Sequence, residues 1–435
     1  PPLPGPCEWC MLVCMAETTS TTDEKRVALS TFHPLVQRWF TAAFAAPTSA
    51  QQLSWPAIAA GHSTLLLAPT GSGKTLSAFL TAIDRIMFGP PLGGESVTVL
   101  YISPLKALAS DIERNLRAPL AGIRAVAEKE GFDYRLPTVA IRTGDTTAQQ
   151  RRAIQKTPPD ILITTPESLY LMLTSRAREV IAGVETVIID EIHALAPTKR
   201  GTHLFLSLER LERLRRWRSP KVDPVQRIGL SATQRPLAEM ARLLGGCEIS
   251  EGAEAYPRPR PVEIVEASRK KQLQLRIETP VDDMARLAQT TPQETIQTGP
   301  ASAGPAIPSI WQSIYPRLVE LIREHRSTII FVNSRRLAER LATAINELAD
   351  SEVALAHHGS IAKERRAVIE DRLKQGQLPA MVATSSMELG IDMGAVDLVI
   401  QIEAPPSIAS GIQRVGRSGH RVDEPSTGVV FPKYR

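Results

Sequence analysis

The chain has 435 residues, more than a single hydrophobic core usually accommodates, so at least two domains are expected. Its composition is that of a globular protein, with 43% hydrophobic and 22% charged residues, and no apolar run approaches the roughly 20 residues of a membrane span. These values exclude a membrane-spanning protein, whereas a net charge of +5 is compatible with nucleic-acid binding but too small to demonstrate it.

The N-terminal residues 1–25 are expected to form a disordered tail. Cys7, Cys10 and Cys14 lie in its Pro-rich part without a visible fourth ligand, which indicates reduced thiols rather than a metal site. Met15 is followed by a Thr/Ser-rich segment and resembles a natural start, so residues 1–14 are interpreted as sequence upstream of it. No positively charged segment opens the chain as it would in a signal peptide, and a cytoplasmic protein is expected.

Strand-like runs alternate with helical patterns, which predicts an α/β fold with parallel sheets. The first series of runs comprises Thr64–Leu67, Val97–Ile102, Thr138–Ile141, Ile161–Thr164, Thr186–Ile189 and Arg227–Leu230. The second series comprises Thr328–Val332, Val353–Ala356, Ala380–Ala383 and Asp397–Ile402. Between the two series lie a Pro-rich segment, Tyr256–Pro261, expected to be a stiff linker, and a mobile loop at about 283–308. We therefore place one domain at 26–256 and another at 257–435.

A phosphate loop follows the first predicted strand, where residues 68–75 have the sequence APTGSGKT. Apolar residues then recur at helical spacing up to Met87, so the loop lies between a strand and a helix, as a phosphate loop requires. Glycines let backbone N–H groups approach a polyphosphate, and the helix N-terminus adds positive potential. Lys74 is expected to reach the β- and γ-phosphates, and the Thr75 hydroxyl to bind Mg²⁺. The remaining nucleotide contacts are assigned to Thr70, Gly71, Ser72 and Gly73.

An acidic pair ends the predicted strand Thr186–Ile189, in the sequence Asp190-Glu191-Ile192-His193. Acidic residues at the carboxyl end of a parallel strand lie beside the phosphate loop in this architecture. Asp190 is expected to hold Mg²⁺ through a water, and Glu191 to orient and deprotonate the attacking water. The alternative for either residue is a solvated strand end.

A charged helix is expected at Glu209–Arg218, with the ion pairs Glu209/Arg213 and Glu212/Arg216 four residues apart. The simplest interpretation is a solvated helix with ordinary ion pairs, and a nucleic-acid-binding face is the alternative.

Further motifs follow in a fixed order, namely Ser231-Ala232-Thr233, residues 331–335 (FVNSR), 383–392 (ATSSMELGID) and 413–421 (QRVGRSGHR). Together with the phosphate loop and the acidic pair, this series resembles the motif set of superfamily 2 helicases over about residues 26–435. The amino-acid sequence around the motifs is most similar to that of the large helicase-related (Lhr) family of ATP-dependent DNA helicases. The resemblance implies two RecA-like domains, each a mainly parallel sheet with helices on both faces, that share one nucleotide between them.

The resemblance assigns roles to several residues. Gln51 matches the glutamine that reads adenine, although a polar residue capping a helix is the alternative. Ser231 and Thr233 match a motif that links the ATP state to domain closure. His193 matches a coupling residue, with a hydrogen-bonded core histidine as the alternative. Gly390 and Asp392 match a motif that contacts both nucleotide and nucleic acid.

Arg417 matches the arginine finger, which stabilises the charge that spreads over the γ-phosphate oxygens in the transition state. Because this arginine lies on the second domain, hydrolysis is expected to require domain closure, and product release to reopen the domains. Many relatives have another arginine where this chain has His420. Either Arg421 substitutes for it, or Arg414 and Arg417 suffice.

Nucleic acid is expected to cross the strand ends of both domains, held by small polar and basic residues that suit phosphate contacts. The candidate residues are Lys106, Arg142, Thr143, Thr165, Pro166, Ser334, Arg335, His358, Thr384 and Ser385. An ordinary loop explains each of them equally well when it is taken alone.

The resulting hypothesis is a monomeric ATP-dependent DNA helicase or translocase that uses Mg²⁺, moves 3′ to 5′ on single-stranded DNA or an RNA/DNA hybrid, and acts in DNA repair. An RNA helicase of the DEAD-box kind and a nucleotide-gated clamp without turnover are the alternatives. The chain stops inside the apolar run Val429–Arg435, so we expect a motor core of a longer protein. Such a core should unwind duplex poorly, because the loop Ala404–Ser410 is the only candidate for a strand-separating wedge.

Overall fold

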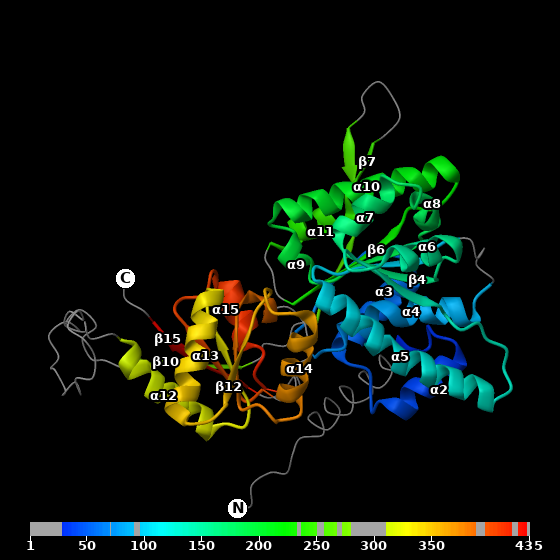
Figure 1. Cartoon of the computed structure of the whole chain (residues 1–435). Helices are drawn as coiled ribbons and strands as arrows, with labels where there is room; N and C mark the ends of the chain where they lie inside the picture. The colour runs from blue at the N-terminus through cyan, green and yellow to red at the C-terminus, as the bar shows by residue number, and fades with distance from the viewer. Residues whose placement is uncertain are drawn as a thin grey trace, which may run out of the picture. The chain divides into compact units, whose positions relative to one another are not determined.

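The computed structural model describes residues 28–69, 71–90, 96–232, 236–249, 256–267, 272–279, 310–388, 396–419 and 425–432. The chain divides into two compact units, Pro1–Arg269 and Lys270–Arg435, each built on its own parallel sheet (Figure 1). The predicted tail at 1–25 and the predicted loop at 283–308 lie outside the described residues. Within them, no helix is both long and apolar enough to cross a membrane.

The sheet of the first unit has seven strands in the order β3-β4-β2-β5-β6-β1-β9, and every neighbouring pair is parallel. The strands are β1 (Thr64–Leu67), β2 (Val99–Ile102), β3 (Val139–Arg142), β4 (Ile161–Thr164), β5 (Thr186–Ile189), β6 (Gln226–Ser231) and β9 (Glu263–Glu266). The first six match the predicted runs to within two residues at either end. Continuous apolar sequence predicts them well, because strands of a covered parallel sheet are buried on both faces.

Helices cover both faces of this sheet. One face packs against α2 (Pro34–Ala43), α3 (Ser49–Ala59), α4 (Lys74–Phe88) and α5 (Lys106–Lys129). The other packs against α7 (Pro166–Leu173), α8 (Arg178–Ile181), α9 (Ile192–Leu195), α10 (Lys199–Arg218) and α11 (Leu237–Gly245). The short helix α6 (Ala148–Lys156) joins β3 to β4. Each face has its own hydrophobic core. In β1, Leu66 packs into the core on the face covered by α4, whereas Leu65 and Leu67 pack into the core on the opposite face, because side chains alternate along a strand.

The predicted boundary between the domains is wrong by 13 residues. The segment interpreted as a stiff linker contains β8 (Pro257–Pro259), which pairs antiparallel with β7 (Cys247–Ile249). The next strand, β9, pairs with β1 and belongs to the first sheet. Only Val265 of β9 is buried, so this edge strand lacks the apolar pattern that identifies a central strand.

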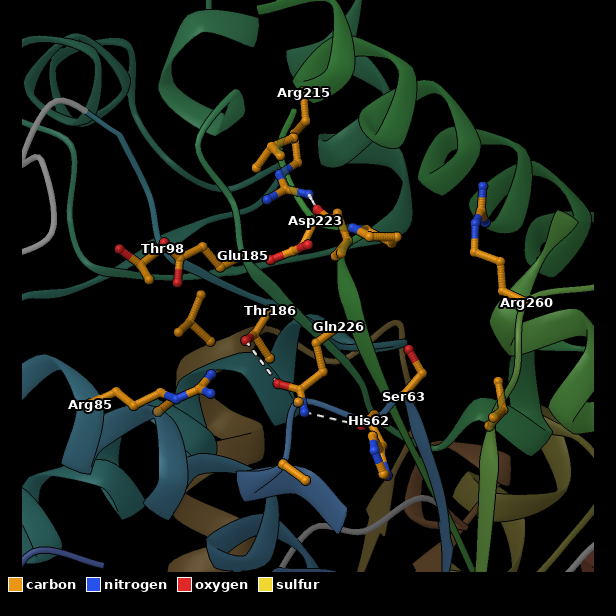
Figure 2. Close-up of a pocket in the computed structure, with 18 of the residues that line it drawn as sticks. His62, Ser63, Arg85, Thr98, Glu185, Thr186, Arg215, Asp223, Gln226 and Arg260 are labelled. Carbon is orange, nitrogen blue, oxygen red and sulfur yellow. Dashed lines mark hydrogen bonds between the residues drawn. The ribbon is translucent and has the colours of Figure 1, made fainter. Parts of the chain in front are cut away.

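The amino ends of the strands in this sheet border a cavity of about 1060 Å³ (Figure 2). Its lining includes His62 before β1, Glu185 before β5 and Asp223 before β6. Gln226 crosses this edge, since its amide accepts a hydrogen bond from Thr186 (3.3 Å) and donates one to the carbonyl of His62 (3.1 Å). Among the described residues, none of those predicted to bind nucleotide or nucleic acid lines the cavity.

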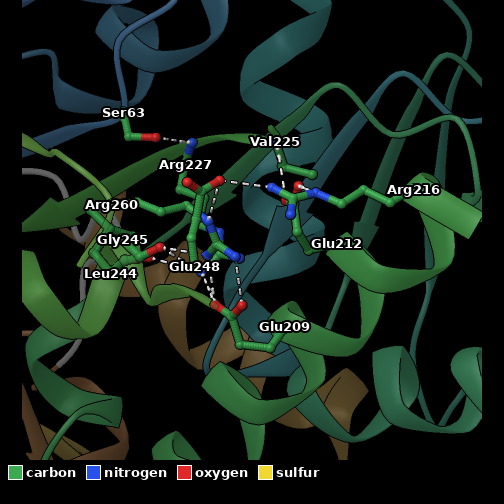
Figure 3. Close-up of polar contacts among 10 residues, drawn as sticks. All are labelled: Ser63, Glu209, Glu212, Arg216, Val225, Arg227, Leu244, Gly245, Glu248 and Arg260. Atoms are coloured by element: carbon green, nitrogen blue, oxygen red, sulfur yellow. Dashed lines mark hydrogen bonds and ion pairs between the residues drawn. The ribbon is translucent and has the colours of Figure 1, made fainter. Parts of the chain in front are cut away.

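A partly buried ion-pair network joins α10 to β6 and to the segment after β8 (Figure 3). Glu212 pairs with Arg216 as predicted, with 3.3 Å between Oε1 and Nε, but Glu212 is only 2% exposed. Glu209 bonds to Arg227 and Arg260, each at 2.8 Å, and not to a residue four positions along the helix. The prediction of a solvated helix with ordinary ion pairs is therefore wrong for this face, because the partners come from distant parts of the chain that only the fold brings together.

The sheet of the second unit has six strands in the order β10-β15-β14-β11-β13-β12, and all neighbouring pairs are parallel. The strands are β10 (Leu273–Ile277), β11 (Thr328–Phe331), β12 (Ala354–His357), β13 (Ala380–Ala383), β14 (Leu398–Ile402) and β15 (Ser426–Phe431). Four of them were predicted, and the apolar run near the end of the chain forms β15. The exposed edge strand β10 was missed.

The helices of the second unit are α12 (Trp311–Glu324), α13 (Arg335–Ala349), α14 (Lys363–Lys374) and α15 (Ile408–Val415), with a short 3₁₀ turn at Ser385–Met387. A single core joins α12 and α13 to β11, β12, β13, β14 and β15. The helix α14 contacts β12 and β13, and α15 contacts β14 and β15. The two units are thus RecA-like α/β folds, as the resemblance implied.

Candidate functional site

The candidate residues of the first unit lie at the carboxyl edge of its sheet. The strand order divides them into two groups along this edge. The adjacent strands β5, β6 and β1 end at Asp190, Ser231 and the phosphate loop. The adjacent strands β2, β4 and β3 lead to Lys106, Thr165 and Arg142. The residues predicted to bind nucleotide and those predicted to bind nucleic acid therefore lie on the same edge of the sheet, in two separate groups.

The phosphate loop leaves the N-terminus of α4 open. Gly71 and Gly73 have φ angles of +79° and +78°, which a residue with a Cβ adopts only with strain. Gly73 is the N-cap of α4 and makes no side-chain cap, so the first N–H groups of that helix are not covered by a capping side chain. A Cβ at Gly73 would lie 2.7 Å from Nε2 of Gln51. An open helix N-terminus behind a glycine loop is suited to bind an anion.

Lys74 and Thr75 stand in the first turn of α4. Nζ of Lys74 donates to the carbonyl of Ala68 (2.6 Å), which keeps the ammonium group above the end of β1. The Thr75 hydroxyl and the Asp190 carboxylate are hard oxygen ligands of the kind that Mg²⁺ takes, usually one or two from protein with the rest from phosphates and water. These residues therefore fit the predicted metal.

Asp190 and Glu191 are buried, at 7% and 6% exposure. Burial, and then the charge of Glu191, raise the pKa of Asp190 to about 7, while a hydrogen bond from Tyr101 and the charge of Lys74 act in the opposite direction. Glu191 has a left-handed backbone (φ 45°, ψ 44°), which is rare for a residue with a side chain and is stored strain of the kind found at functional sites. No pattern in the amino-acid sequence indicates this strain.

His193 joins the acidic pair to the motif at Ser231. Its Nδ1 lies 3.2 Å from Oγ of Ser231 and 3.5 Å from Oε2 of Glu191, and all three side chains are buried. The structure thus brings together three residues that stand up to 40 positions apart in the sequence. This geometry accommodates both the coupling role and the alternative of a hydrogen-bonded core histidine, so the coupling role stays a prediction.

Gln51 forms a capping box with Thr48 at the start of α3. Its Oε1 accepts from the backbone N–H of Thr48 (2.9 Å), and its own N–H bonds to Oγ1 of Thr48 (3.3 Å). Thr48 in turn donates to the carbonyl of Ser72 in the phosphate loop (2.7 Å). The helix cap considered as the alternative is therefore present, and it anchors Gln51 against the phosphate loop. The reading of adenine stays a prediction.

The nucleic-acid candidates of the first unit are less exposed than expected. Arg142 is 8% exposed, and burial followed by the charge of Arg151 lowers its pKa. Its Nη1 is buried and has no hydrogen-bond partner among the described residues. Lys106 is exposed and pairs with Asp145 (2.5 Å). Three other candidates are buried, namely Thr143, Thr165 and Pro166.

Arg200 was not singled out from the sequence. Its Nη1 donates to the carbonyl of Pro104 (2.5 Å) and its Nη2 to Oε2 of Glu167 (2.9 Å). It therefore ties the loop after β2 to the first turn of α7, at the edge where the nucleic-acid candidates lie. No pattern in the sequence reveals this bridge, because its three members are far apart in the chain.

The candidates of the second unit also follow neighbouring strands. Ser334 and Arg335 come after β11, Thr384 and Ser385 after β13, and His358 after β12. Arg335 donates to Oγ of Ser360 (2.6 Å), and His358 pairs with Glu339 (2.7 Å).

The two arginines of the second unit differ in burial. Arg414 is 1% exposed, and its guanidinium bonds to Glu388 through Nε (2.7 Å) and to Gln401 through Nη1 (2.8 Å). Arg417 is half-buried, and its Nη2 donates to the carbonyl of Glu388 (2.6 Å). A guanidinium held by buried partners within the unit suits a positioning role, so the contacts favour Arg417 over Arg414 as the finger.

Six residues of the predicted site lie outside the described residues. They are Thr70, Thr233, Gly390, Asp392, His420 and Arg421.

Two protein-family models match the chain. The DEAD/DEAH box helicase model matches residues 48–240, and the helicase conserved C-terminal domain model matches residues 313–421. Their matches fall in the first and second units, respectively. The fold and these two matches are similar to those of a two-unit helicase core of the DEAD/DEAH-box class.

The chain is similar to helicases of the Lhr family. It is 50% identical to the Lhr helicase/probable uracil glycosylase of Mycolicibacterium smegmatis, over 94% of this chain and 27% of that protein. It is 40% identical to the ATP-dependent helicase Lhr-Core of Methanocaldococcus jannaschii, over 91% and 43%. The structure of Mycobacterium smegmatis helicase Lhr bound to ssDNA and AMP-PNP matches with a TM-score of 0.78 and 53% identity, over 94% of this chain and 48% of that one. The chain thus spans less than half the length of these relatives.

Proposed function

We propose that the chain is the motor core of an ATP-dependent DNA helicase or translocase, which hydrolyses ATP in order to move along single-stranded DNA. The observation that carries the proposal is the buried pair Asp190–Glu191 on the same sheet edge as an open, glycine-led helix N-terminus. Buried acids are retained where their charge is used, and an anion-binding helix end beside them suits phosphoryl transfer.

In this mechanism the loop residues Gly71, Ser72 and Gly73 hold the polyphosphate with backbone N–H groups, and Lys74 holds the β- and γ-phosphates. Thr75 and Asp190 would hold Mg²⁺, which supplies charge neutralisation at the phosphates when it is bound. Glu191 takes a proton from water as the water oxygen bonds to the γ-phosphorus and the bond to the bridging oxygen of ADP breaks.

The second unit contributes Arg417, which we propose stabilises the charge on the γ-phosphate oxygens in the transition state. If hydrolysis requires an arginine from another unit, each turnover is coupled to closing and reopening of the two units. The proposal includes movement in the 3′ to 5′ direction and a role in DNA repair, both implied by the resemblance to the Lhr family, and a cytoplasmic location.

The test is the steady-state ATPase activity of the chain alone, with single-stranded DNA, and with single-stranded RNA of the same sequence. A DNA helicase core should be stimulated by DNA at least as strongly as by RNA. Stimulation by RNA alone would favour the DEAD-box alternative. Tight nucleotide binding without turnover would favour the clamp.

The nucleic-acid contacts are tested separately by titrating scrambled oligonucleotides at two salt concentrations. Contacts to phosphates predict affinities that differ little between sequences and fall steeply with salt. A tenfold or larger preference for one sequence would contradict this assignment.

A further inference from the structure

Tyr101 is a fully buried residue of β2 that contacts the acidic pair directly. Its phenol Oη donates a hydrogen bond to Oδ2 of Asp190. The two strands are paired, with Tyr101 opposite Ile188, and the N–H of Asp190 continues the ladder to the carbonyl of Ile102 (3.0 Å). The phenol therefore approaches Asp190 from a rigid, central part of the sheet.

Both oxygens of the Asp190 carboxylate have a donor. Oδ2 accepts from Tyr101, and Oδ1 accepts from the backbone N–H of Glu191 (2.9 Å). Two donors on opposite oxygens fix the rotation of the carboxylate and leave one further lone pair on each oxygen for another ligand. A carboxylate with one donor would be free to turn about its Cβ–Cγ bond.

The ring of Tyr101 is itself held by the helix of the phosphate loop. Phe79 of α4 stacks on it, with 5.0 Å between ring centroids and 22° between ring planes. The same helix carries Thr75 one turn earlier. Tyr101 therefore links the two parts of the chain, α4 and the end of β5, that bear the two predicted ligands of Mg²⁺.

We propose that Tyr101 is a positioning residue that orients the Asp190 carboxylate toward the Mg²⁺ of Mg²⁺-ATP. This inference rests on the proposed function, because it gives Asp190 a metal to hold. The partners that orient metal ligands are worth about 10–100-fold in metal affinity in proteins generally. The sequence did not suggest this role, since a tyrosine inside an apolar run is indistinguishable from an ordinary core residue.

The test is Tyr101→Phe, which removes the hydroxyl and keeps the ring against Phe79. The measurement is the affinity for a fluorescent ATP analogue, first with Mg²⁺ and then with EDTA. The ratio of the affinity in Mg²⁺ to the affinity in EDTA reports the contribution of the metal to nucleotide binding and does not depend on turnover. We expect this ratio to fall about tenfold in Tyr101→Phe, with the affinity in EDTA unchanged. The Mg²⁺ concentration for half-maximal ATPase activity should rise by a similar factor, and turnover at saturating Mg²⁺ should largely recover.

Tyr134→Phe is the matched control, because Tyr134 also donates to a carboxylate, that of Glu128 (2.8 Å), but at an exposed site. Its Mg²⁺ ratio should equal that of the wild type. Phe79→Leu keeps the phenol and loosens the ring, so a smaller loss of about threefold is expected and serves as a second variant if Tyr101→Phe fails to fold. In an Asp190→Asn background, Tyr101→Phe should have no further effect on the ratio.

An unchanged ratio in a folded Tyr101→Phe chain would overturn the positioning role alone. If the wild-type chain bound nucleotide no better with Mg²⁺ than with EDTA, the proposed function itself would fail. The two failures are therefore distinguishable.

Discussion

The two units share one architecture but differ in how the N-terminus of the helix after a central strand is capped. In the first unit, β1 leads through a glycine loop to α4, whose N-cap Gly73 has no capping side chain. In the second unit, β11 leads to α13, whose N-cap Ser334 accepts a hydrogen bond from the N–H of Leu337 (3.2 Å). One helix N-terminus is left for an anion, and the other is closed by its own chain.

The acidic and basic groups differ between the units in the same way. The first unit buries the carboxylates Asp190 and Glu191 beside its open helix end, whereas the second buries the guanidinium of Arg414 among polar partners. A difference in a few residues at strand ends therefore separates a unit that can hold a nucleotide from one that can supply an arginine. The shared fold therefore sets where functional groups can lie, and the loops at the strand ends decide which groups lie there.

The largest expected effects come from the first unit. Lys74→Ala and Glu191→Gln should each abolish ATP hydrolysis, the first by removing the charge that binds phosphate and the second by removing the base. Turnover assays paired with nucleotide-binding measurements separate them, since only Lys74→Ala should lose affinity. An equal loss of binding in both variants would refute the role given to Glu191.

The second unit should affect turnover without affecting binding. Arg417→Ala is expected to lower turnover by about 10³ with little change in ATP affinity, because a finger acts mainly in the transition state. Arg414→Ala is the comparison, and it should also destabilise the unit because it removes a buried group with several partners. Near-normal turnover in Arg417→Ala would reverse the assignment of the two arginines.

The pH dependence of stability offers a test on α4 itself. Burial raises the pKa of Asp84 to about 6, although the N–H of His33 bonds to its Oδ1 (2.9 Å) and acts in the opposite direction. The folded chain therefore binds this proton more tightly than the unfolded chain, whose aspartates titrate near about 3.9. As a result, the contribution of Asp84 to the free energy of unfolding falls as the pH rises from about 4 to about 6.

Asp84→Asn should remove that fall and raise the free energy of unfolding at pH 7.5 by on the order of 2 kcal/mol, with no gain at pH 4. Urea unfolding followed by tryptophan fluorescence in a Trp311→Phe background reports on the first unit, where Trp55 is buried. Asp133→Asn, at an exposed position, is the control. The same difference between Asp84→Asn and wild type at both pH values would rule out the burial effect.

The smallest effect concerns the closed helix end. Ser334→Ala removes the cap of α13 and should lower the stability of the second unit by about 1 kcal/mol, with nucleotide affinity unchanged. Gly73→Ala, at the corresponding end of α4, should weaken nucleotide binding about tenfold, because its φ of +78° strains a side chain. If Ser334→Ala changed nucleotide affinity as much as Gly73→Ala does, the proposed difference between the two helix N-termini would be wrong.

The amino-acid sequence alone predicted the class of fold, the strands that are buried on both faces and the motifs at their carboxyl ends. It did so because apolar runs, glycine loops and acidic pairs are local patterns, and the phosphate loop, Asp190 and Glu191 are readable without their neighbours. The same reasoning failed at the exposed edge strands β9 and β10. In β9 only two apolar residues stand together, whereas β10 does alternate Leu273, Leu275 and Ile277 with polar residues and was overlooked.

The folded structure alone brings distant residues into contact. The phenol of Tyr101 on Asp190, the bridge from Arg200 to Glu167, and the pairing of Glu209 with Arg227 and Arg260 join residues between 18 and 89 positions apart. It also decided that Glu191 has a left-handed backbone and that Arg414 is buried. The physical reason is that hydrogen bonds and ion pairs across a sheet depend on strand order and register, which follow from the packing of the whole unit and not from any local segment.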